Sequence, residues 1–134
     1  MELSINKKDK IHLIGIGGIG MSGIALILKK MGYDVQGSDI SKKSKSLDFL
    51  KKNKIKIFNN HKSQNTKNAK IVVISTAIKR SNSEFQAAIK KKLLIIRRAD
   101  MLAHIISLKK NIVISGSHGK TTITSLVSTI LKDA

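Results

Sequence analysis

The sequence predicts an α/β protein built on a doubly wound, parallel β-sheet. Short apolar runs, which are typical of strands, alternate along the 134-residue chain with longer segments of helical periodicity. Two glycine-built loops, at residues 15–20 and 116–122, each follow an apolar run and precede a helical segment. Ligands of such sheets bind at the carboxyl ends of the strands, so both loops stand where ligands are expected.

The first half of the chain predicts three strands and two helices. Residues 11–14 are an apolar run that ends in glycine, and the longer run at residues 21–31 stops at Gly32, so a strand and a buried helix are expected there. Leu47 and Leu50 lie within a lysine-rich helical segment. The other two strands are expected at residues 35–38 and 55–58.

The second half continues the alternation. Residues 71–74 are a run of β-branched side chains, as expected of a strand buried on both faces of a parallel sheet. Ser81 and Glu84 have the spacing of a capping box, which predicts a helix from that point. Asp100 predicts the start of another short helix, because an acidic side chain is favourable at a helix N-terminus. The remaining expected elements are an exit loop at residues 76–80 and strands at residues 93–96 and 112–114.

The seam between two domains is expected at residues 109–111. We expect residues 1–110 to form a Rossmann-like domain, and residues 111–134 to form the first strand, phosphate loop and helix of a second α/β domain. One strand and one helix cannot bury a core of their own. The second domain is therefore expected to be truncated.

Composition excludes several classes of protein. The chain has no cysteine, which rules out disulfides, thiolate zinc sites and cysteine nucleophiles. Its net charge of +18 comes mostly from dispersed lysines, with arginine only at positions 80, 97 and 98, and its aromatic content is 3%, so no nucleic-acid partner is expected. Five glycines interrupt the apolar stretch at residues 11–28, so no membrane insertion is expected. A cytoplasmic location fits this composition.

The first glycine loop reads GIGGIG from Gly15 to Gly20, which matches the dinucleotide-binding fingerprint. Such glycines permit a tight turn and let backbone N–H groups approach a pyrophosphate. Asp39 stands about twenty residues farther on, where the fingerprint has an acidic residue, although it could equally cap the helix after Ser41. NAD, FAD and UDP-sugars all present a pyrophosphate to such a loop, so the motif alone leaves the ligand open.

The second glycine loop reads GSHGKTT over residues 116–122. Backbone N–H groups of such a loop cradle phosphate oxygens, while Lys120 can neutralise the β- and γ-phosphates and the Thr121 hydroxyl can coordinate Mg²⁺. The loop is a shortened variant, because Ile114 stands where the strict pattern has glycine. His118 either contacts the ligand or shapes the turn. The pattern predicts a site for the phosphates of a nucleotide with Mg²⁺.

These loops and their surroundings resemble the Mur ligases of peptidoglycan synthesis. The opening loop matches from Gly15 to Gly23, and the second loop matches with His118 where most of the family carries Asn. Further family segments are matched in the right order by residues 37–39, 75–78 and 96–102. The resemblance spans nearly the whole chain, with Ser117 in place of the usual Thr.

The resemblance implies different ligands for the two loops. The UDP-sugar is expected to bind through Gly15, Gly17, Gly18, Ile19, Gly20, Met21, Ser22, Asp39, His61, Thr76, Ala77 and Ile78. ATP is expected to bind through Gly116, Ser117, His118, Gly119, Lys120, Thr121 and Thr122, with Lys120 catalytic and Thr121 a ligand of Mg²⁺. Two roles are equally possible for Arg97 and Arg98. They bind an anion, or they are solvent-exposed charges at the start of a helix.

The reaction implied by the resemblance is ATP-dependent amide formation. The match is closest to the family member that joins L-alanine to UDP-N-acetylmuramate, in which ATP phosphorylates the muramyl carboxylate and the alanine amine attacks the acyl phosphate. The family continues through further domains, so we expect the chain alone to bind the UDP-sugar without ligating alanine. The alternative is an NAD(P)-binding domain of an oxidoreductase or redox sensor, which leaves the second loop unexplained.

Overall fold

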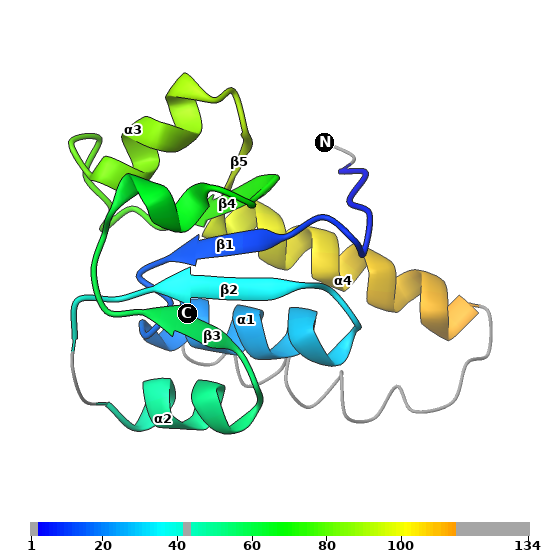
Figure 1. Cartoon of the computed structure of the whole chain (residues 1–134). Helices are drawn as coiled ribbons and strands as arrows, with labels where there is room; N and C mark the ends of the chain where they lie inside the picture. Colours follow the sequence, from blue (N-terminus) through cyan, green and yellow to red (C-terminus); the bar gives the residue numbers. More distant parts are fainter. Residues whose placement is uncertain (1–2, 42–43, 115–134) are drawn as a thin grey trace.

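The computed structural model describes residues 3–41 and 44–114 of the chain. Its centre is a five-stranded parallel sheet with the strand order β3-β2-β1-β4-β5 (Figure 1). The predicted doubly wound parallel sheet is therefore confirmed. The strands are β1 (Ile11–Ile14), β2 (Val35–Ser38), β3 (Lys56–Phe58), β4 (Ile71–Ile74) and β5 (Leu94–Arg97).

The direction in which strands are added reverses between β1 and β4. After β1 the chain adds β2 and β3 on one side, and it then crosses back to add β4 and β5 on the other side. Ile11 of β1 pairs with Val35 of β2 on one side and with Ile71 of β4 on the other. Because the connections from β1 and β4 leave in opposite directions, a crevice forms at the carboxyl ends of these strands.

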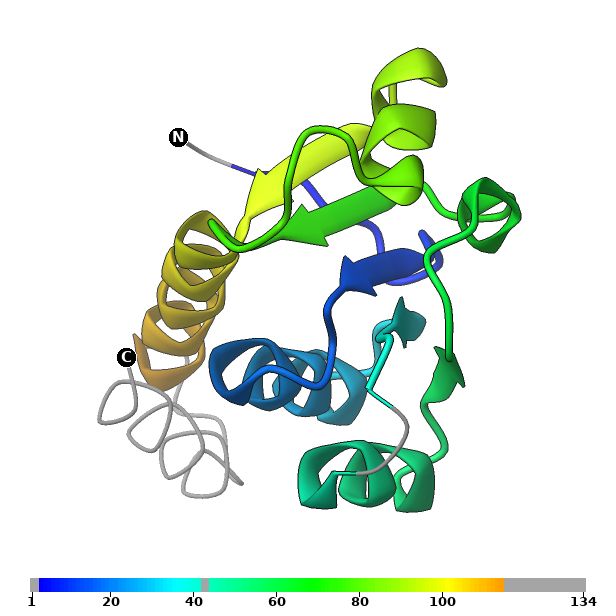
Figure 2. The same ribbon diagram turned by 90° about the vertical axis from the view of Figure 1, so that its left-hand side faces the viewer.

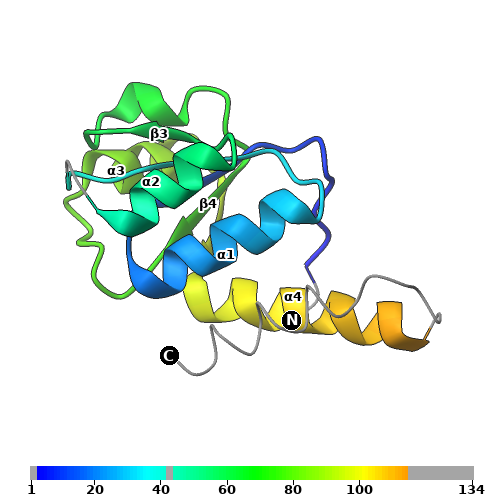
Figure 3. The same cartoon turned by 90° about the horizontal axis from the view of Figure 1, so that it is seen from below.

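Helices cover both faces of the sheet, but unequally (Figures 2 and 3). Helix α1 lies between two other helices and contacts both of them. These three helices cover one face and are α1 (Ile19–Lys30), α2 (Lys45–Lys52) and α4 (Arg98–Ile114). The opposite face carries α3 (Ser83–Lys90) and the short 3-10 helix η1 (Ser63–Thr66), which contact each other.

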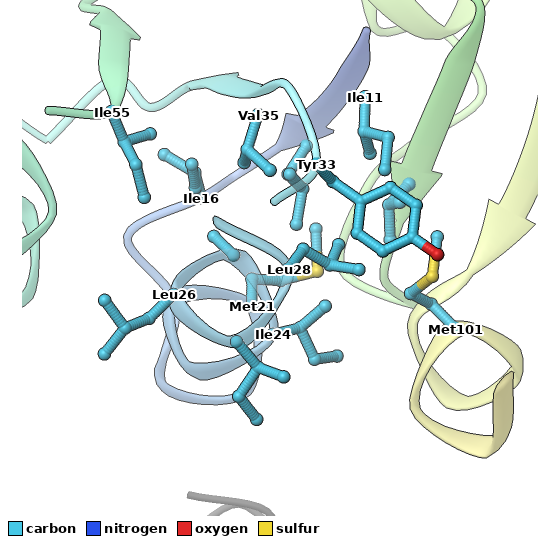
Figure 4. Close-up of a cluster of buried hydrophobic side chains, with 14 of the residues drawn as sticks. Ile11, Ile16, Met21, Ile24, Leu26, Leu28, Tyr33, Val35, Ile55 and Met101 are labelled. Carbon is cyan, nitrogen blue, oxygen red and sulfur yellow. The ribbon is translucent and has the colours of Figure 1, made fainter. Parts of the chain in front are cut away.

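The main hydrophobic core lies between the sheet and α1, with α4 beside it (Figure 4). Strand alternation sends Ile11 and Leu13 toward α1, and both are fully buried. Because helices flank α1 on both sides, most of its circumference is covered. Its buried residues are Met21, Ile24, Ala25, Leu26, Ile27 and Leu28. Burying each large aliphatic side chain contributes about 1.5–3 kcal/mol, so this layer holds α1 and the loop that precedes it.

The core on the α3 side of the sheet is smaller and partly polar. Its buried apolar residues are Ile14, Val72, Ile74 and Ala88. Beside them lie the buried polar side chains of His12, Gln36, Ser38, Asn65 and Glu84. Burial of a polar group is costly unless the group is hydrogen-bonded, and each of these side chains is.

The expected capping box at Ser81 and Glu84 is wrong. The N-cap of α3 is Asn82, whose Oδ1 accepts hydrogen bonds from the N–H groups of Glu84 and Phe85. A capping box would need the Glu84 carboxylate to turn back toward the helix start. That carboxylate is instead buried against the sheet, so Asn82, an equally good capping residue, begins the helix.

The strand expected at residues 112–114 is also wrong, because α4 runs from Arg98 to Ile114. A helix satisfies its backbone N–H and C=O groups within one segment, whereas a strand needs a neighbouring strand. In the part of the chain that the structure describes, only five strands form the sheet, and none pairs with residues 112–114. Helix α4 passes through residues 109–111 without a break, and the domain division there stays a prediction.

Candidate functional site

A cleft of about 400 Å³ opens at the carboxyl ends of β1, β2 and β4, where the order of the strands reverses. We call it the glycine cleft. Its lining comes from the glycine loop, the segment after β2, the loop after β4 and the start of α4. The lining residues are Gly15, Gly17, Gly18, Gly20, Met21, Asp39, Ser41, Ser44, Ser75, Ala77, Ile78 and Arg98. The topology and the sequence motif thus point to one place.

The first part of the glycine loop is bonded to the sheet. The N–H groups of Gly15 and Ile16 both donate to the carbonyl of Ser38, at 2.8 and 3.0 Å, and the N–H of Gly18 donates to the carbonyl of Gly15. Gly15 has a φ of +75°, a conformation that is costly for a residue with a Cβ atom. Glycine at this position therefore lets the chain leave β1, while Ser38 holds the turn.

Asp39 fixes the middle of the loop. Its Oδ2 accepts a hydrogen bond from the Gly17 N–H at 2.8 Å, and its Oδ1 accepts one from the Ser41 N–H at 2.9 Å. The helix-cap role that the sequence left open is excluded, because Ser44 caps α2 and its Oγ accepts a hydrogen bond from the Leu47 N–H. The Asp39 carboxylate instead forms part of the wall of the glycine cleft.

The open donors of the loop are at the start of α1. Gly18 is the N-cap residue of this helix and has no side chain to cap it. The N–H groups of Ile19, Gly20 and Met21 donate to no acceptor within residues 3–41 and 44–114. Such first-turn N–H groups carry partial positive charge and bind anions. The loop therefore presents three unused donors at the glycine cleft.

Arg98 brings a full positive charge to the same helix end. A Cβ atom added to Gly20 would lie 3.1 Å from Cδ and 3.2 Å from Nη1 of Arg98, so the arginine side chain passes directly over the third glycine of the fingerprint. Arg98 is the first residue of α4, and α4 packs against α1. Of the two roles that the sequence left open for Arg98, its position favours anion binding.

The loop after β4 forms the opposite wall of the cleft. Ala77 and Ile78 line the cleft, and Ile78 Cδ1 lies 3.4 Å from the place that a Cβ atom on Gly15 would take. The Ala77 N–H donates to Ser75 Oγ at 3.3 Å, which shapes the turn. Thr76 lines a neighbouring cleft and not this one.

A buried carboxylate lies on the α3 face of the sheet, close to the strand end that holds the loop. Glu84 is 0% exposed. Its Oε1 accepts hydrogen bonds from His12 Nε2 at 2.9 Å and from Ser38 Oγ at 2.5 Å, and its Oε2 accepts one from Asn65 Nδ2 at 2.6 Å. Burial alone would raise the pKa of Glu84, but His12, Ser38 and Asn65 favour the ionised form and together lower the pKa below its ordinary value.

Gln36 orients His12 toward this carboxylate. The side-chain amide of Gln36 donates to His12 Nδ1 at 2.9 Å and to the carbonyl of Asn65 at 2.8 Å. Because Nδ1 accepts a hydrogen bond, the ring proton is on Nε2, which faces Glu84. The resulting network joins β1, β2, η1 and α3, mostly through side chains.

His61 stands at the outer end of this network. Its Nδ1 is 3.0 Å from Ser38 Oγ and 3.5 Å from Glu84 Oε1, and its side chain is 20% exposed. Ser38 donates its only proton to Glu84, so its Oγ accepts a hydrogen bond from His61 Nδ1. His61 therefore contacts the serine whose carbonyl holds the glycine loop, and it does not line the glycine cleft.

The structure brings most of the predicted UDP-sugar residues into one cleft. Those that line it are Gly15, Gly17, Gly18, Gly20, Met21, Asp39, Ala77 and Ile78. Those that do not are Ile19, Ser22, His61 and Thr76. Ile19 nevertheless contributes an open N–H, and the Ser22 hydroxyl donates to the Ile19 carbonyl at 3.0 Å.

Sequence reasoning missed several side chains near the cleft. Ser41, Ser44 and Ser75 belong to its lining, and no motif marks such single hydroxyls. Glu84 was missed because its spacing from Ser81 favours a helix cap, whereas its partners are 72, 46 and 19 residues away along the chain.

The predicted ATP loop lies outside the described residues, so the roles of Gly116, Ser117, His118, Gly119, Lys120, Thr121 and Thr122 stay predictions. Among the residues that the structure describes, no group of three or more His, Cys, Asp or Glu side chains is placed to hold a metal ion. No helix in this part of the chain has the length and apolar character needed to cross a membrane.

Known proteins resemble this chain in sequence and in fold. The family described as "Mur ligase family, catalytic domain" matches residues 10–110. The chain is 55% identical to the UDP-N-acetylmuramate–L-alanine ligase of Pelagibacter ubique, over 97% of this chain and 28% of that protein. It is 51% identical to the ligase of the same name from Azorhizobium caulinodans, over 90% of this chain and 26% of that protein.

A solved structure with the same overall fold is the UDP-N-acetylmuramate–alanine ligase of Thermotoga maritima. It superimposes with a TM-score of 0.71 at 34% identity, over 75% of this chain and 23% of that one. The chain therefore spans about a quarter of the length of the relatives that it matches.

Proposed function

Because the chain belongs to the Mur ligase family, we propose that it is the UDP-sugar-binding part of a ligase that joins L-alanine to UDP-N-acetylmuramate. The observation that carries the proposal is the glycine cleft. Three open N–H groups at the start of α1 and the Arg98 guanidinium meet there, at the point where the strand order reverses. This arrangement is complementary to a diphosphate, and the names of the relatives indicate which diphosphate ester.

The diphosphate is held by backbone and side chain together. The N–H groups of Ile19, Gly20 and Met21 donate to its oxygens, and the helix dipole of α1 adds favourable potential. Arg98 supplies the balancing charge from the side of α4. Glycine at position 20 lets Arg98 approach the helix end this closely, because a Cβ atom there would lie 3.1 Å from Arg98 Cδ and would make the arginine shift.

The ribose is held on the β2 side of the cleft. The Asp39 carboxylate is fixed by the Gly17 and Ser41 N–H groups, and its remaining lone pairs can accept hydrogen bonds from ribose hydroxyls. The Ser41 residue itself also lines the cleft. This part of the site would suit the ribose of any dinucleotide, so it supports a nucleotide ligand without selecting UDP.

His61 and Glu84 act through Ser38. The Ser38 hydroxyl bonds to both of them, and the Ser38 carbonyl accepts from the Gly15 and Ile16 N–H groups. We assign the two residues a positioning role, in which the buried network keeps the end of β2 and the loop in register. In this proposal His61 does not itself contact the uridine.

We assign ATP binding to residues 111–134, which in this proposal begin a second domain. The alignment with the Pelagibacter relative covers 97% of this chain and so includes most of this segment. Bound ATP with Mg²⁺ would supply the phosphoryl group that activates the muramyl carboxylate, with Lys120 and Thr121 as its contacts. The chain alone is expected to release no ADP with alanine and UDP-N-acetylmuramate. The cytoplasmic location stays a prediction.

The NAD(P)-binding alternative is not favoured. Relatives at 50–55% identity carry the name of a ligase that acts on UDP-N-acetylmuramate. The two readings differ in the ligand that fills the glycine cleft, so a binding experiment separates them.

The test is isothermal calorimetry of the 134-residue chain with UDP-N-acetylmuramate, UDP and NADH. The proposal expects saturable binding of UDP-N-acetylmuramate and of UDP, and no binding of NADH at the same concentration. Tight binding of NADH with no response to either uridine nucleotide would overturn it. A coupled ADP assay on the same sample tests the expected absence of ligation.

A further inference from the structure

A second cleft of about 480 Å³ lies beside the glycine cleft and contains every arginine of the chain. Arg80, Arg97 and Arg98 line it together with Ser75, Thr76 and Phe85. We call it the arginine cleft. Arg98, Ser75 and Ile78 line both clefts, so the two adjoin and share a wall.

The topology of the sheet brings these arginines together from three different elements. Arg80 is in the loop after β4, Arg97 is the last residue of β5, and Arg98 is the first residue of α4. Arg97 pairs with Ile74 across the neighbouring strands, so both strand ends open into the cleft. The Gln86 side chain donates a hydrogen bond to the Arg80 carbonyl, which holds this loop against α3.

In the part of the chain that the structure describes, no carboxylate neutralises the three guanidinium groups. Within residues 3–41 and 44–114, the Glu84 carboxylate contacts the rings of His12 and His61, and no carboxylate contacts an arginine side chain. Like charges repel when they are placed together, so three unpaired cations in one cleft cost stability unless an anion joins them. Ser75 and Thr76 add hydroxyl groups, and the first turn of α4 adds the positive end of its dipole.

The choice of arginine over lysine is specific to this place. The chain has 26 Lys and Arg residues, and only the three at this cleft are arginine. A guanidinium group offers a planar pair of donors that matches the two oxygens of a carboxylate or phosphate, whereas a lysine ammonium offers a point charge. Lysine would supply the same positive charge, as it does elsewhere on this chain.

We propose that the arginine cleft is a second anion-binding subsite, which holds a carboxylate or phosphate group next to the diphosphate in the glycine cleft. Two molecules could supply such an anionic group. One is the carboxylate of the acidic sugar on the ligand in the glycine cleft, and this source rests on the proposed function. The other is a separate phosphate ion, which does not.

The test compares the wild-type chain with the double variant Arg80→Ala/Arg97→Ala, which leaves Arg98 in place. Calorimetry is run in phosphate-free buffer with UDP, UDP-N-acetylglucosamine, UDP-N-acetylmuramate and inorganic phosphate. UDP-N-acetylglucosamine lacks the lactyl ether that carries the carboxylate of the muramate, and it shares the rest of the ligand. The control variant Lys79→Ala/Lys90→Ala removes the same charge from neighbouring exposed positions.

If the sugar carboxylate is the anion, the wild-type chain binds UDP-N-acetylmuramate about tenfold or more tightly than UDP-N-acetylglucosamine, and the double variant loses this difference. If a separate anion is bound, phosphate binds in the presence of saturating UDP, and the double variant loses that binding. In both cases the double variant binds UDP as tightly as the wild-type chain does. The control variant binds every ligand with the affinity of the wild-type chain.

The proposal is overturned if the double variant changes neither the preference for the muramate nor the binding of phosphate. A thermal melt of each variant confirms that it is folded before it is titrated. A failure of the proposed function is distinguishable, because it appears as absent UDP binding in the wild-type chain, and the phosphate titration still tests the arginine cleft in that case.

Discussion

The two faces of the sheet hold their helices in different ways. Toward α1 the contacts are apolar and numerous, as with Ile11 and Leu13, whereas toward α3 the central contacts are a few hydrogen bonds around the Glu84 carboxylate. The faces meet at neighbouring residues of β2. Gly37 makes room for the Ile16 side chain of the glycine loop, and the Ser38 carbonyl accepts hydrogen bonds from its backbone. Contacts on both faces of the sheet therefore fix the glycine loop. A substitution can remove the contacts on one face and leave those on the other.

The largest effect is expected from Gly37→Ala, on the apolar face. The added Cβ atom would lie 2.5 Å from Ile16 Cδ1 and 2.7 Å from the Leu13 carbonyl oxygen, and the backbone atom cannot move aside. We expect a loss of about 3 kcal/mol in the free energy of unfolding, measured by urea denaturation. The control is Gly18→Ala, whose Cβ atom would meet its nearest neighbour at 3.4 Å. Equal stability of the two variants would contradict the close packing of the loop on β2.

The next effect is expected from Glu84→Gln, on the polar face. One carboxylate oxygen becomes an NH₂ group that faces the donors of His12, Ser38 or Asn65, so at least one buried donor loses its acceptor. We expect a loss of about 2 kcal/mol in the free energy of unfolding. Asp34→Asn makes the same change at an exposed carboxylate and should cost less than about 0.5 kcal/mol. Equal losses in the free energy of unfolding for the two variants would show that the buried network does not stabilise the fold.

The polar face should also make stability depend on pH. The folded-state pKa of Glu84 lies below its ordinary value, so at acid pH the unfolded chain binds a proton more readily than the folded chain does. The stability contributed by Glu84 is therefore complete above the unfolded pKa of about 4.3 and is lost as the pH falls through the folded-state pKa. Urea titrations from pH 7 to pH 3 should show this loss, and Glu84→Gln should reduce it. An identical pH profile for both chains would argue against the network.

A smaller effect, on binding instead of stability, is expected from Arg98→Ala. The side chain is half-buried over Gly20, and its removal takes the balancing charge from the glycine cleft. The affinity for UDP should fall about tenfold, as measured by calorimetry, which corresponds to about 1.4 kcal/mol. Lys70→Ala removes an equal charge just before β4, at the amino ends of the strands and away from the glycine cleft, and should leave the affinity unchanged. An equal loss in both variants would indicate that general charge, and not Arg98, attracts the nucleotide.

The same difference between the faces decides what the sequence can predict. The apolar face follows from strand alternation and from the run of buried residues in α1, which are local patterns. The glycine loop is also local, because backbone donors leave a motif of consecutive glycines. Glu84 is not local, since it bonds to His12, which is 72 residues away. Its carboxylate is drawn into that network, and Asn82 takes over the capping of α3.

The role of Arg98 and the secondary structure of residues 112–114 depend on neighbouring elements, which the sequence of a single segment does not reveal. Arg98 could be assigned to the cleft only once α4 was seen to pack beside α1, over Gly20. Residues 112–114 are β-branched and apolar, which favours a strand, but a strand is stable only beside another strand. These residues continue α4 instead.

The most direct test of the central claim is a ¹⁵N NMR titration of the chain with UDP, followed at the amides of the glycine loop. If the diphosphate binds at the start of α1, the amide signals of Ile19, Gly20 and Met21 change most. Those of Gly15 and Ile16, whose N–H groups already donate to Ser38, change least. Unchanged signals at Ile19, Gly20 and Met21, with the nucleotide bound elsewhere, would contradict the account.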